Sequence, residues 1–258
     1  MSDIVLERPE PRLAILTISR PARRNALNAE AWRDLGHAFA ALRQDDALRA
    51  IILTGAGGAF CAGDDIAAFA AVRDDPPARQ AYWDHIMACY AAVSASRVPV
   101  VAAVSGPCVG GGCTLALRCD FRIADATARF GVPPAKLGLV YPADSTQLLV
   151  ATAGVSMAKR LLYTGVLIGA EEAASCGLVD TVAPDAMAAS RDFVLPMLDA
   201  APLSVAAAKL ACDAAMAGRI AEVAEAVMAL SNRADASEDY REGVRAFAEK
   251  RRPVFTGR

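Results

Sequence analysis

Residues 100–114 read Val-Val-Ala-Ala-Val-Ser-Gly-Pro-Cys-Val-Gly-Gly-Gly-Cys-Thr, an apolar run followed by a cluster of glycines. Its five apolar residues predict a short strand without a polar face, the glycines end that strand, and a helix is expected near Thr114. The same order occurs earlier, where the strand Ala50-Ile-Ile-Leu-Thr54 runs into Gly55-Ala-Gly-Gly58. Strands that are hydrophobic on both faces and alternate with helices predict an α/β fold with helices packed on the sheet.

The flanking sequence extends this alternation in both directions. The stretch Asn25-Ala-Leu-Asn-Ala-Glu30 supplies a helix cap and an acidic first turn, and apolar residues recur at helical spacing after it, from Trp32 to Leu42. The predicted strands cover residues 4–6, 13–18, 121–124 and 128–130, and a further helix covers about 80–93. Asp-Asp-Pro-Pro at 74–77 predicts an irregular loop before that helix.

A helical tail follows the α/β region. Three helices are predicted between Ser204 and Lys250, and Ser237 is the expected cap of the last one. Their apolar positions need a partner surface. We therefore expect an α/β core at residues 1–198 and a C-terminal oligomerisation region at 199–258.

Length and composition exclude several classes of protein. The 258 residues fit one large domain or a domain with an appendage. A net charge of −2 lacks the basic excess of a general nucleic-acid binder, so no nucleic-acid partner is expected. The longest apolar run near the middle, Val98–Val104, has seven residues and contains a proline, whereas a membrane span needs about 20. No membrane association is predicted.

The cysteines indicate a reducing environment. Seven cysteines, none in a Cys-x-x-Cys pattern, argue against both a disulfide framework and a zinc site. The N-terminus lacks a basic segment followed by an apolar one, which predicts no secretory signal. We expect a cytoplasmic protein without a metal ion.

The two glycine clusters follow strands, where α/β sheets place ligands. Neither cluster has the lysine of a phosphate-binding loop or the Gly-x-Gly-x-x-Gly pattern of a dinucleotide site. Glycines let backbone N–H groups approach a ligand, and two such groups at one oxygen form an oxyanion hole. The alternative is that both clusters are only tight strand-to-helix turns.

Five ordered blocks of sequence carry a family resemblance. They lie at residues 19–28, 59–66, 103–113, 119–124 and 242–251, and together they resemble the crotonase superfamily of enoyl-CoA hydratases and isomerases. The resemblance implies a spiral of repeated strand-strand-helix units with a C-terminal helical trimerisation region. It also implies an acyl-CoA substrate, no separate cofactor because CoA is part of that substrate, and a homotrimer or a dimer of trimers.

The resemblance also assigns positions in the site. The two N–H groups that hold the thioester oxygen map to Asp64 and Gly111. The positions that map to CoA contacts are Arg23, Arg24, Ala26, Ala62, Gly63, Asp65, Ile66, Lys250 and Phe255. Of these, Asp65 is also a predicted helix cap, and a neighbouring subunit is expected to supply Lys250 and Phe255.

The residues that hydratases of this superfamily use as a glutamate pair are missing. Their positions are Thr114 and Pro134, and neither side chain exchanges a proton as an acid or base near neutral pH. An aspartate that some relatives use at a later site maps to Pro142, with Asp144 two residues on.

The segment from Pro133 to Pro142 is similar to that of methylmalonyl-CoA decarboxylase, which has a tyrosine at the position of Tyr141. Loss of CO2 from a malonyl-type thioester forms the enolate without a general base. Tyr141 is therefore a candidate to orient the carboxylate or to stand near the proton donor, although a loop tyrosine without a chemical role is the alternative. Asp64 either repels an anionic group or is itself the missing acid or base.

Three other side chains are weaker candidates. His37 is expected either at the surface or in the core with its hydrogen bonds made, and His85 lies in the segment that lines acyl pockets in the superfamily. Cys113 is interpreted as a packing residue. The sequence thus favours a decarboxylase-like enzyme, with an enoyl-CoA hydratase or Δ3,Δ2-enoyl-CoA isomerase, or a non-catalytic acyl-CoA-binding homologue, as the alternatives.

Overall fold

The computed structural model describes residues 3–258 and contains two sheets. The six-stranded sheet has the order β1-β2-β3-β4-β6-β9, parallel throughout except for the antiparallel pair β1 and β2. A three-stranded sheet has the order β5-β7-β8. The strands are β1 Ile4–Glu10, β2 Leu13–Ile18, β3 Ala50–Gly55, β4 Val100–Val104, β5 Pro107–Val109, β6 Phe121–Ala124, β7 Arg129–Gly131, β8 Ile168–Gly169 and β9 Thr181–Val182.

The helices alternate with these strands in the core and then continue alone. They are η1 Pro21–Arg23, α1 Ala29–Leu42, α2 Ile66–Ala71, α3 Pro76–Ser94, α4 Gly111–Leu117, α5 Pro134–Leu137, α6 Ala143–Thr164, α7 Ala170–Ser175, α8 Ala186–Leu198, α9 Pro202–Met216, α10 Ile220–Asp235 and α11 Glu238–Glu249. The predicted strands at 13–18, 50–54, 100–104 and 121–124 are confirmed, as is the α/β fold.

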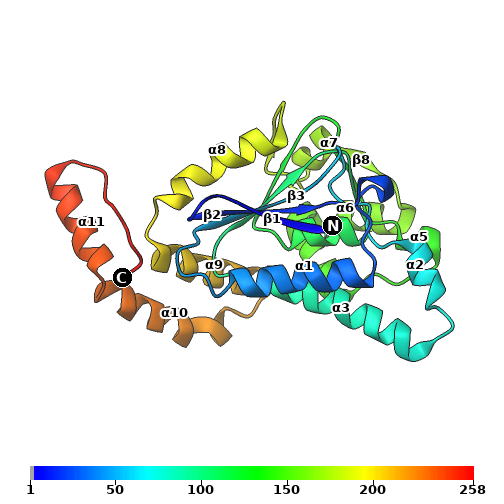
Figure 1. The fold of residues 1–258 in the computed structure, drawn as a ribbon, viewed down its shortest axis with the longest axis horizontal. Helices are drawn as coiled ribbons and strands as arrows, with labels where there is room; N and C mark the ends of the chain where they lie inside the picture. The colour runs from blue at the N-terminus through cyan, green and yellow to red at the C-terminus, as the bar shows by residue number, and fades with distance from the viewer. Residues whose placement is uncertain (1–2) are drawn as a thin grey trace.

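The central strands are buried on both faces, as their composition predicts. Along β3, Ile51 and Leu53 enter one hydrophobic cluster, whereas Ile52 enters another. Helices α1 and α3 cover the first face and α8 covers the second (Figure 1). This double cover explains why these strands lack the polar alternation of a sheet with one solvent-exposed face.

Helix starts follow the capping residues. The side chains of Asn28 and Asp65 accept hydrogen bonds from the N–H groups of Ala31 (2.9 Å) and Ala68 (3.3 Å). This confirms the predicted cap Asp65 and identifies Asn28 as the cap expected within residues 25–30. The irregular loop expected at 74–77 holds for Asp74 and Asp75 and is wrong for Pro76 and Pro77. Asp75 caps α3, and the two prolines after it occupy the first turn of α3, where their missing N–H groups cost nothing.

The helix after the second glycine cluster begins three residues earlier than expected. Helix α4 starts at Gly111 and not near Thr114, because Gly110 turns the chain with a φ of 56°. A positive φ costs glycine little, so the turn is completed inside the glycine run. The first turn of α4 therefore contains glycines, and its N–H groups are not shielded by side chains.

The three tail helices are confirmed as α9, α10 and α11, and Ser237 caps α11. The ammonium group of Lys209 on α9 lies 2.6 Å from Asp120 in the core and 3.3 Å from Asp213 on the same helix. The contact with Asp120 joins α9 to the core. Helices α10 and α11 extend away from the sheet, at the end of the molecule opposite α2 and α5 (Figure 1).

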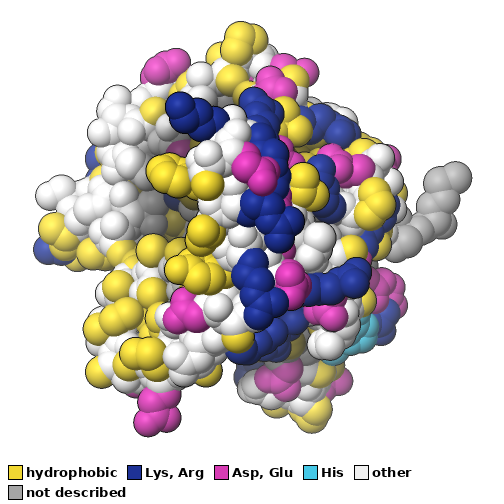
Figure 2. Space-filling model, turned by 90° about the vertical axis from the view of Figure 1, so that its left-hand side faces the viewer, with side chains coloured by type: hydrophobic (Ala, Val, Ile, Leu, Met, Phe, Trp, Pro, Cys, Tyr) yellow, Lys and Arg dark blue, Asp and Glu magenta, His cyan; other side chains and the backbone are white. Residues whose placement is uncertain are grey.

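The outer end of the tail carries exposed apolar side chains. Phe247 is 87% exposed, and Met228, Val244 and Val254 are also exposed. Figure 2 shows hydrophobic side chains beside a band of Lys and Arg on this end of the molecule. Surfaces of this kind are typical of contacts between protein chains.

Within residues 3–258, no single helix is long and apolar enough to cross a membrane. The pair α8 and α9 passes that test only together, with a bend of 114° between them.

Candidate active site

The two glycine loops lie side by side at the carboxyl ends of β3 and β4. The N–H of Cys61 donates to the carbonyl of Pro107 (2.9 Å), and the N–H of Val109 donates to the carbonyl of Cys61 (3.0 Å). A Cβ on Gly112 would lie 2.1 Å from the Cys61 carbonyl oxygen. The glycines therefore serve a close approach between two loops, and the interpretation of two separate tight turns is insufficient.

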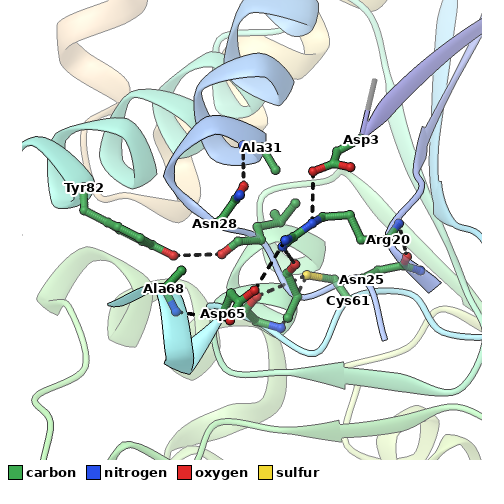
Figure 3. A network of polar contacts seen from close by, with 12 residues as sticks. Asp3, Arg20, Asn25, Asn28, Ala31, Cys61, Asp65, Ala68 and Tyr82 are labelled. Carbon is green, nitrogen blue, oxygen red and sulfur yellow. Dashed lines mark hydrogen bonds and ion pairs between the residues drawn. The ribbon is translucent and has the colours of Figure 1, made fainter. Parts of the chain in front are cut away.

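A third loop, residues 19–28, supports the first glycine loop (Figure 3). The fully buried Asn25 accepts from the N–H of Arg20 (2.8 Å) and donates to the carbonyls of Ala56 (2.8 Å) and Ala59 (2.6 Å). The N–H of Leu27 donates to the carbonyl of Gly63 (2.8 Å). The position of Asp64 thus depends on this loop.

Replacing Asn25 is expected to destabilise the protein. Asn25→Ala leaves buried backbone groups without partners, and each such group costs about 1–3 kcal/mol. We expect a decrease of about 2–4 kcal/mol in the free energy of unfolding, measured in urea. The exposed Asn232→Ala is the control and should stay within about 0.5 kcal/mol of the unchanged protein; equal effects of both variants would contradict the role of Asn25.

A pocket of about 200 Å³ opens at the two glycine loops. Its walls are mostly apolar, and Asp64 supplies the one carboxylate among the described residues that line it. The lining residues are Ala62, Asp64, Ile66, Phe69, Trp83, Ile86, Tyr90, Val109, Gly110, Gly111, Thr114, Pro133, Pro134, Leu137, Leu139, Val140, Tyr141 and Pro142. Such a pocket suits the acyl part of a ligand and has one acid–base group.

Asp64 is partly buried at the floor of this pocket. Desolvation raises its pKa to about 6, against the opposing effect of hydrogen bonds from the indole N–H of Trp32 (3.0 Å) and from its own backbone N–H. A carboxyl with such a pKa exists in both protonation states near neutral pH and can take up or release a proton.

The backbone N–H groups of Asp64 and Gly111 come from the two adjoining loops. A Cβ on Gly63 would lie 3.1 Å from the Gly111 nitrogen, so the two chains touch at this point. Gly111 is the first residue of α4, and its N–H has no acceptor within the helix. An oxyanion between the loops has to compete with the Asp64 carboxylate for the Asp64 N–H.

Tyr141 and Thr114 form a hydroxyl pair in the pocket wall. Their oxygens are 2.6 Å apart, and the Thr114 hydroxyl also donates to the Gly110 carbonyl (3.2 Å). When the Thr114 hydroxyl donates its proton to the Gly110 carbonyl, the Tyr141 hydroxyl is the donor in the bond between Tyr141 and Thr114. Burial raises the pKa of Tyr141, which keeps its hydroxyl protonated. The sequence alone does not reveal this contact.

Two of the positions considered for acid–base chemistry lie in the pocket without an ionisable group. Thr114 and Pro134 both line it. Asp144, at the start of α6, does not line it, and its carboxylate accepts a hydrogen bond from Arg118 (2.5 Å). Partial burial favours its protonated form, but the hydrogen bond and charge of Arg118 outweigh this effect and lower the pKa of Asp144.

The positions that resemble CoA contacts fall into two groups. Ala62 and Ile66 line the pocket, and the Arg24 carbonyl accepts from the Ala62 N–H (3.0 Å). Arg23 is exposed, and the Ala26 carbonyl accepts a hydrogen bond from Arg20. Gly63 lies in the loop beside Gly111. Asp65 caps α2 and forms an ion pair with Arg20 at 3.4 Å.

Lys250 and Phe255 form the second group. They follow α11, which lies at the end of the molecule opposite α2 and α5 (Figure 1), and neither residue lines the pocket. One chain therefore does not bring them to its own pocket.

The remaining candidates have no contact with the pocket. His37 is exposed on α1, and His85 is partly buried on α3 but does not line the pocket. Cys113 is fully buried in the core. Residues 3–258 contain no group of three or more His, Cys, Asp or Glu side chains arranged to hold a metal ion.

No sequence motif identifies Trp32 and Tyr90 as residues of the site, although both lie behind the glycine loops. Trp32 has the spacing of a core residue of α1, and Tyr90 lies among the apolar residues of α3. Nothing in their local sequence separates them from packing residues, because their polar atoms meet partners that are distant in the chain.

Comparisons with known proteins place the chain in a family. A family model described as enoyl-CoA hydratase/isomerase matches residues 9–258. The chain is 37% identical over 262 residues to the crotonyl-CoA hydratase of Syntrophomonas wolfei, with 98% of this chain and 97% of that protein covered. It is 34% identical over 269 residues to the 2,3-dehydroadipyl-CoA hydratase of Escherichia coli, with both covered at 100%.

A solved structure of an enoyl-CoA hydratase/isomerase family protein from Hyphomonas neptunium superimposes with a TM-score of 0.92 at 37% identity, covering 99% of this chain and 98% of that one. The fold, the paired glycine loops and these relatives agree. The chain belongs to the enoyl-CoA hydratase/isomerase family of the crotonase superfamily.

Proposed function

We propose that the protein forms the enolate of an enoyl-CoA thioester and moves protons on it with Asp64, as a double-bond isomerase does. The observation that carries this proposal is the Asp64 carboxylate beside Gly111, with a pKa raised to about 6 in a pocket that is otherwise apolar. One carboxylate is enough for isomerisation, because the same group can remove a proton from one carbon and return it to another.

The proposed reaction has two proton transfers. The thioester oxygen of a 3-enoyl-CoA accepts hydrogen bonds from the N–H groups of Asp64 and Gly111. The Asp64 carboxylate removes the proton from carbon 2, and the electron pair of that C–H bond moves toward the thioester oxygen to form a dienolate. Asp64 then delivers the proton to carbon 4, and the double bond ends between carbons 2 and 3. Each donor of such a hole contributes roughly 3 kcal/mol.

The two relatives named above are hydratases, and hydration requires different acid–base groups from isomerisation. Water addition in this superfamily uses two carboxylates, and Thr114 and Pro134 occupy their positions. We expect slow hydration of crotonyl-CoA, with Asp64 as the single base.

Decarboxylation, the reaction that the sequence favours, has no support among the relatives named here, which are hydratases. One observation keeps it as a second candidate: the Tyr141 hydroxyl, bonded to Thr114 in an apolar wall, is a possible proton source for an enolate. The negative charge that Asp64 carries above pH 6 opposes a substrate carboxylate.

The proposal is tested with three thioesters, whose products are separated by liquid chromatography and detected by mass spectrometry, because the 3-enoyl and 2-enoyl isomers have the same mass. Purified protein is incubated with a 3-enoyl-CoA, crotonyl-CoA and methylmalonyl-CoA. Conversion of the 3-enoyl-CoA to its 2-enoyl isomer as the fastest reaction supports the proposal. Faster hydration of crotonyl-CoA, or faster loss of CO2 from methylmalonyl-CoA, overturns it. Binding of all three thioesters without turnover identifies a non-catalytic homologue.

Tyr141→Phe separates the two candidate reactions. If Tyr141 supplies the proton after decarboxylation, we expect loss of CO2 from methylmalonyl-CoA to fall by about 100-fold, whereas isomerisation changes little. The exposed Tyr163→Phe on α6 is the matched control. Unchanged decarboxylation in Tyr141→Phe would show that its hydroxyl has no chemical role.

We further propose that the protein assembles as a homotrimer or a dimer of trimers, with the tail of one chain near the pocket of another. The exposed apolar residues of α10 and α11 support this, as does the distance of Lys250 and Phe255 from the pocket of their own chain. Sedimentation should show three or six chains at micromolar concentration, and Phe247→Asp should reduce this assembly. A stable monomer would contradict the proposal.

A further inference from the structure

We propose that Trp32 and Tyr90 form an aromatic brace that positions both halves of the site: Trp32 orients the Asp64 carboxylate, and Tyr90 holds the Gly111 carbonyl. Both are positioning residues. The Trp32 part rests on the proposed function of Asp64, whereas the two contacts themselves do not depend on it.

The two rings pack edge to face behind the glycine loops. Their centroids are 5.4 Å apart with an angle of 81°, and Trp32 is 0% and Tyr90 4% exposed. They come from α1 and α3, which pack against each other over the same face of the sheet. A pair buried in this way has little freedom to rotate, so the polar atoms on its edges have fixed positions.

The indole of Trp32 leaves one oxygen of Asp64 directed toward Gly111. Its N–H donates to Oδ1 (3.0 Å), and Oδ2 lies 3.1 Å from the point that a Cβ on Gly111 would occupy. Without the indole N–H, the carboxylate keeps its backbone contact but loses the donor that selects this rotamer. Trp32 therefore decides which oxygen faces a bound thioester.

The hydroxyl of Tyr90 acts on the other half of the site. It donates to the Gly111 carbonyl (3.2 Å), and it lies 3.2 Å from the same Cβ point. Glycine has the greatest backbone freedom of any residue, so a side-chain bond to its carbonyl restricts the first turn of α4. The guanidinium of Arg118, 5.3 Å from the centre of the Tyr90 ring, packs on this ring.

Burial keeps Tyr90 a donor. It raises the pKa of Tyr90 well above the ordinary value, so the hydroxyl stays protonated near neutral pH. Both donors of the brace, the Trp32 indole N–H and the Tyr90 hydroxyl, are therefore neutral. Of their two acceptors, the Asp64 carboxylate and the Gly111 carbonyl, only the carboxylate titrates.

The Trp32 contact is tested by NMR of protein with 13C-labelled aspartate carboxyls, without substrate. Asp64 is expected to titrate near pH 6, and in Trp32→Phe its midpoint should rise by about 1 pH unit, because a hydrogen bond to the charged form is lost. The exposed Tyr163→Phe, outside the pocket, should leave the midpoint unchanged. An equal midpoint in Trp32→Phe and the unchanged protein would overturn this half of the brace.

A second measurement avoids any loss of folding. In the unchanged protein labelled with 15N-tryptophan, the indole N–H resonance of Trp32 should move with the Asp64 midpoint, and the movement should vanish in Asp64→Asn. An indole resonance that does not follow the titration overturns the contact even if Trp32→Phe is unstable.

The Tyr90 contact is tested by Tyr90→Phe, which removes one oxygen. Amide hydrogen exchange at Gly111 and Gly112 should become at least about tenfold faster. On a thioester that is turned over, kcat should fall about tenfold with little change in KM. Tyr163→Phe is the control for both readouts, and unchanged exchange in Tyr90→Phe would overturn this half. Because the exchange and NMR readouts need no turnover, failure of the brace is distinguishable from failure of the proposed reaction.

Discussion

Asp64→Asn is expected to reduce kcat/KM by about 10²- to 10⁴-fold on the thioester that the protein isomerises, the usual range for loss of an acid–base group. The amide keeps the shape of the side chain and an oxygen that can accept from Trp32, but it cannot take up the substrate proton. In the unchanged protein, the dependence of kcat/KM on pH should show a limb near pH 6, with activity rising as Asp64 ionises. The variant should lack this limb.

Asp84→Asn, an exposed carboxylate on α3, is the control and should keep both the rate and the limb. Retention of more than about a tenth of the activity in Asp64→Asn would show that another group moves the proton.

The same substitution is expected to stabilise the fold above pH 6. The folded pKa of Asp64, about 6, exceeds the ordinary value of 3.8, so the folded state binds more protons between these values. The stability that this group contributes is therefore present below about pH 4 and is lost as pH rises through 6, by up to about 3 kcal/mol. An asparagine does not ionise and avoids this loss.

Urea unfolding at two pH values checks this sign. The stability advantage of Asp64→Asn over the unchanged protein should be larger at pH 8 than at pH 5 by about 1 kcal/mol. Because the comparison is between two proteins at each pH, the other titrating groups cancel. An advantage that shrinks from pH 5 to pH 8 would contradict the raised pKa.

Gly111→Ala is expected to reduce kcat/KM by about 10³-fold while the protein stays folded. A Cβ at this position would lie 3.1 Å from Asp64 Oδ2, 3.1 Å from Trp32 Cζ2 and 3.2 Å from the Tyr90 hydroxyl. It would push the Asp64 carboxylate and the Gly111 backbone out of the positions that the proposed reaction needs. The side chains around it have to shift by a few tenths of an ångström, which costs far less than unfolding.

Gly169→Ala is the matched control, since a Cβ there would have only one neighbour, at 4.0 Å from Arg129, and its φ of −79° suits any residue. Circular dichroism should be the same for both variants, and rate measurements should separate them. Full activity in Gly111→Ala would show that the reaction does not need the free space beside the Gly111 Cα.

The fold was predictable because its signals are local. The apolar strands β3 and β4, the caps Asn28 and Asp65, and the three tail helices all follow from residues within a few positions of one another. The segment 74–77, where the expected loop was wrong at 76–77, has two prolines that suit both a loop and a first helical turn. Only the side chain of Asp75, bonded to the N–H of Ala78, decides between them.

The sequence by itself determined that two glycine loops stand at strand ends, that the glutamate pair of hydratases is missing, and which family the blocks resemble. The tertiary structure decided what these loops can do, because it brings Trp32, Asp64, Tyr90 and Gly111 together from four separate elements. The raised pKa of Asp64 has the same origin, since desolvation depends on everything packed around the carboxyl and on nothing in its immediate sequence.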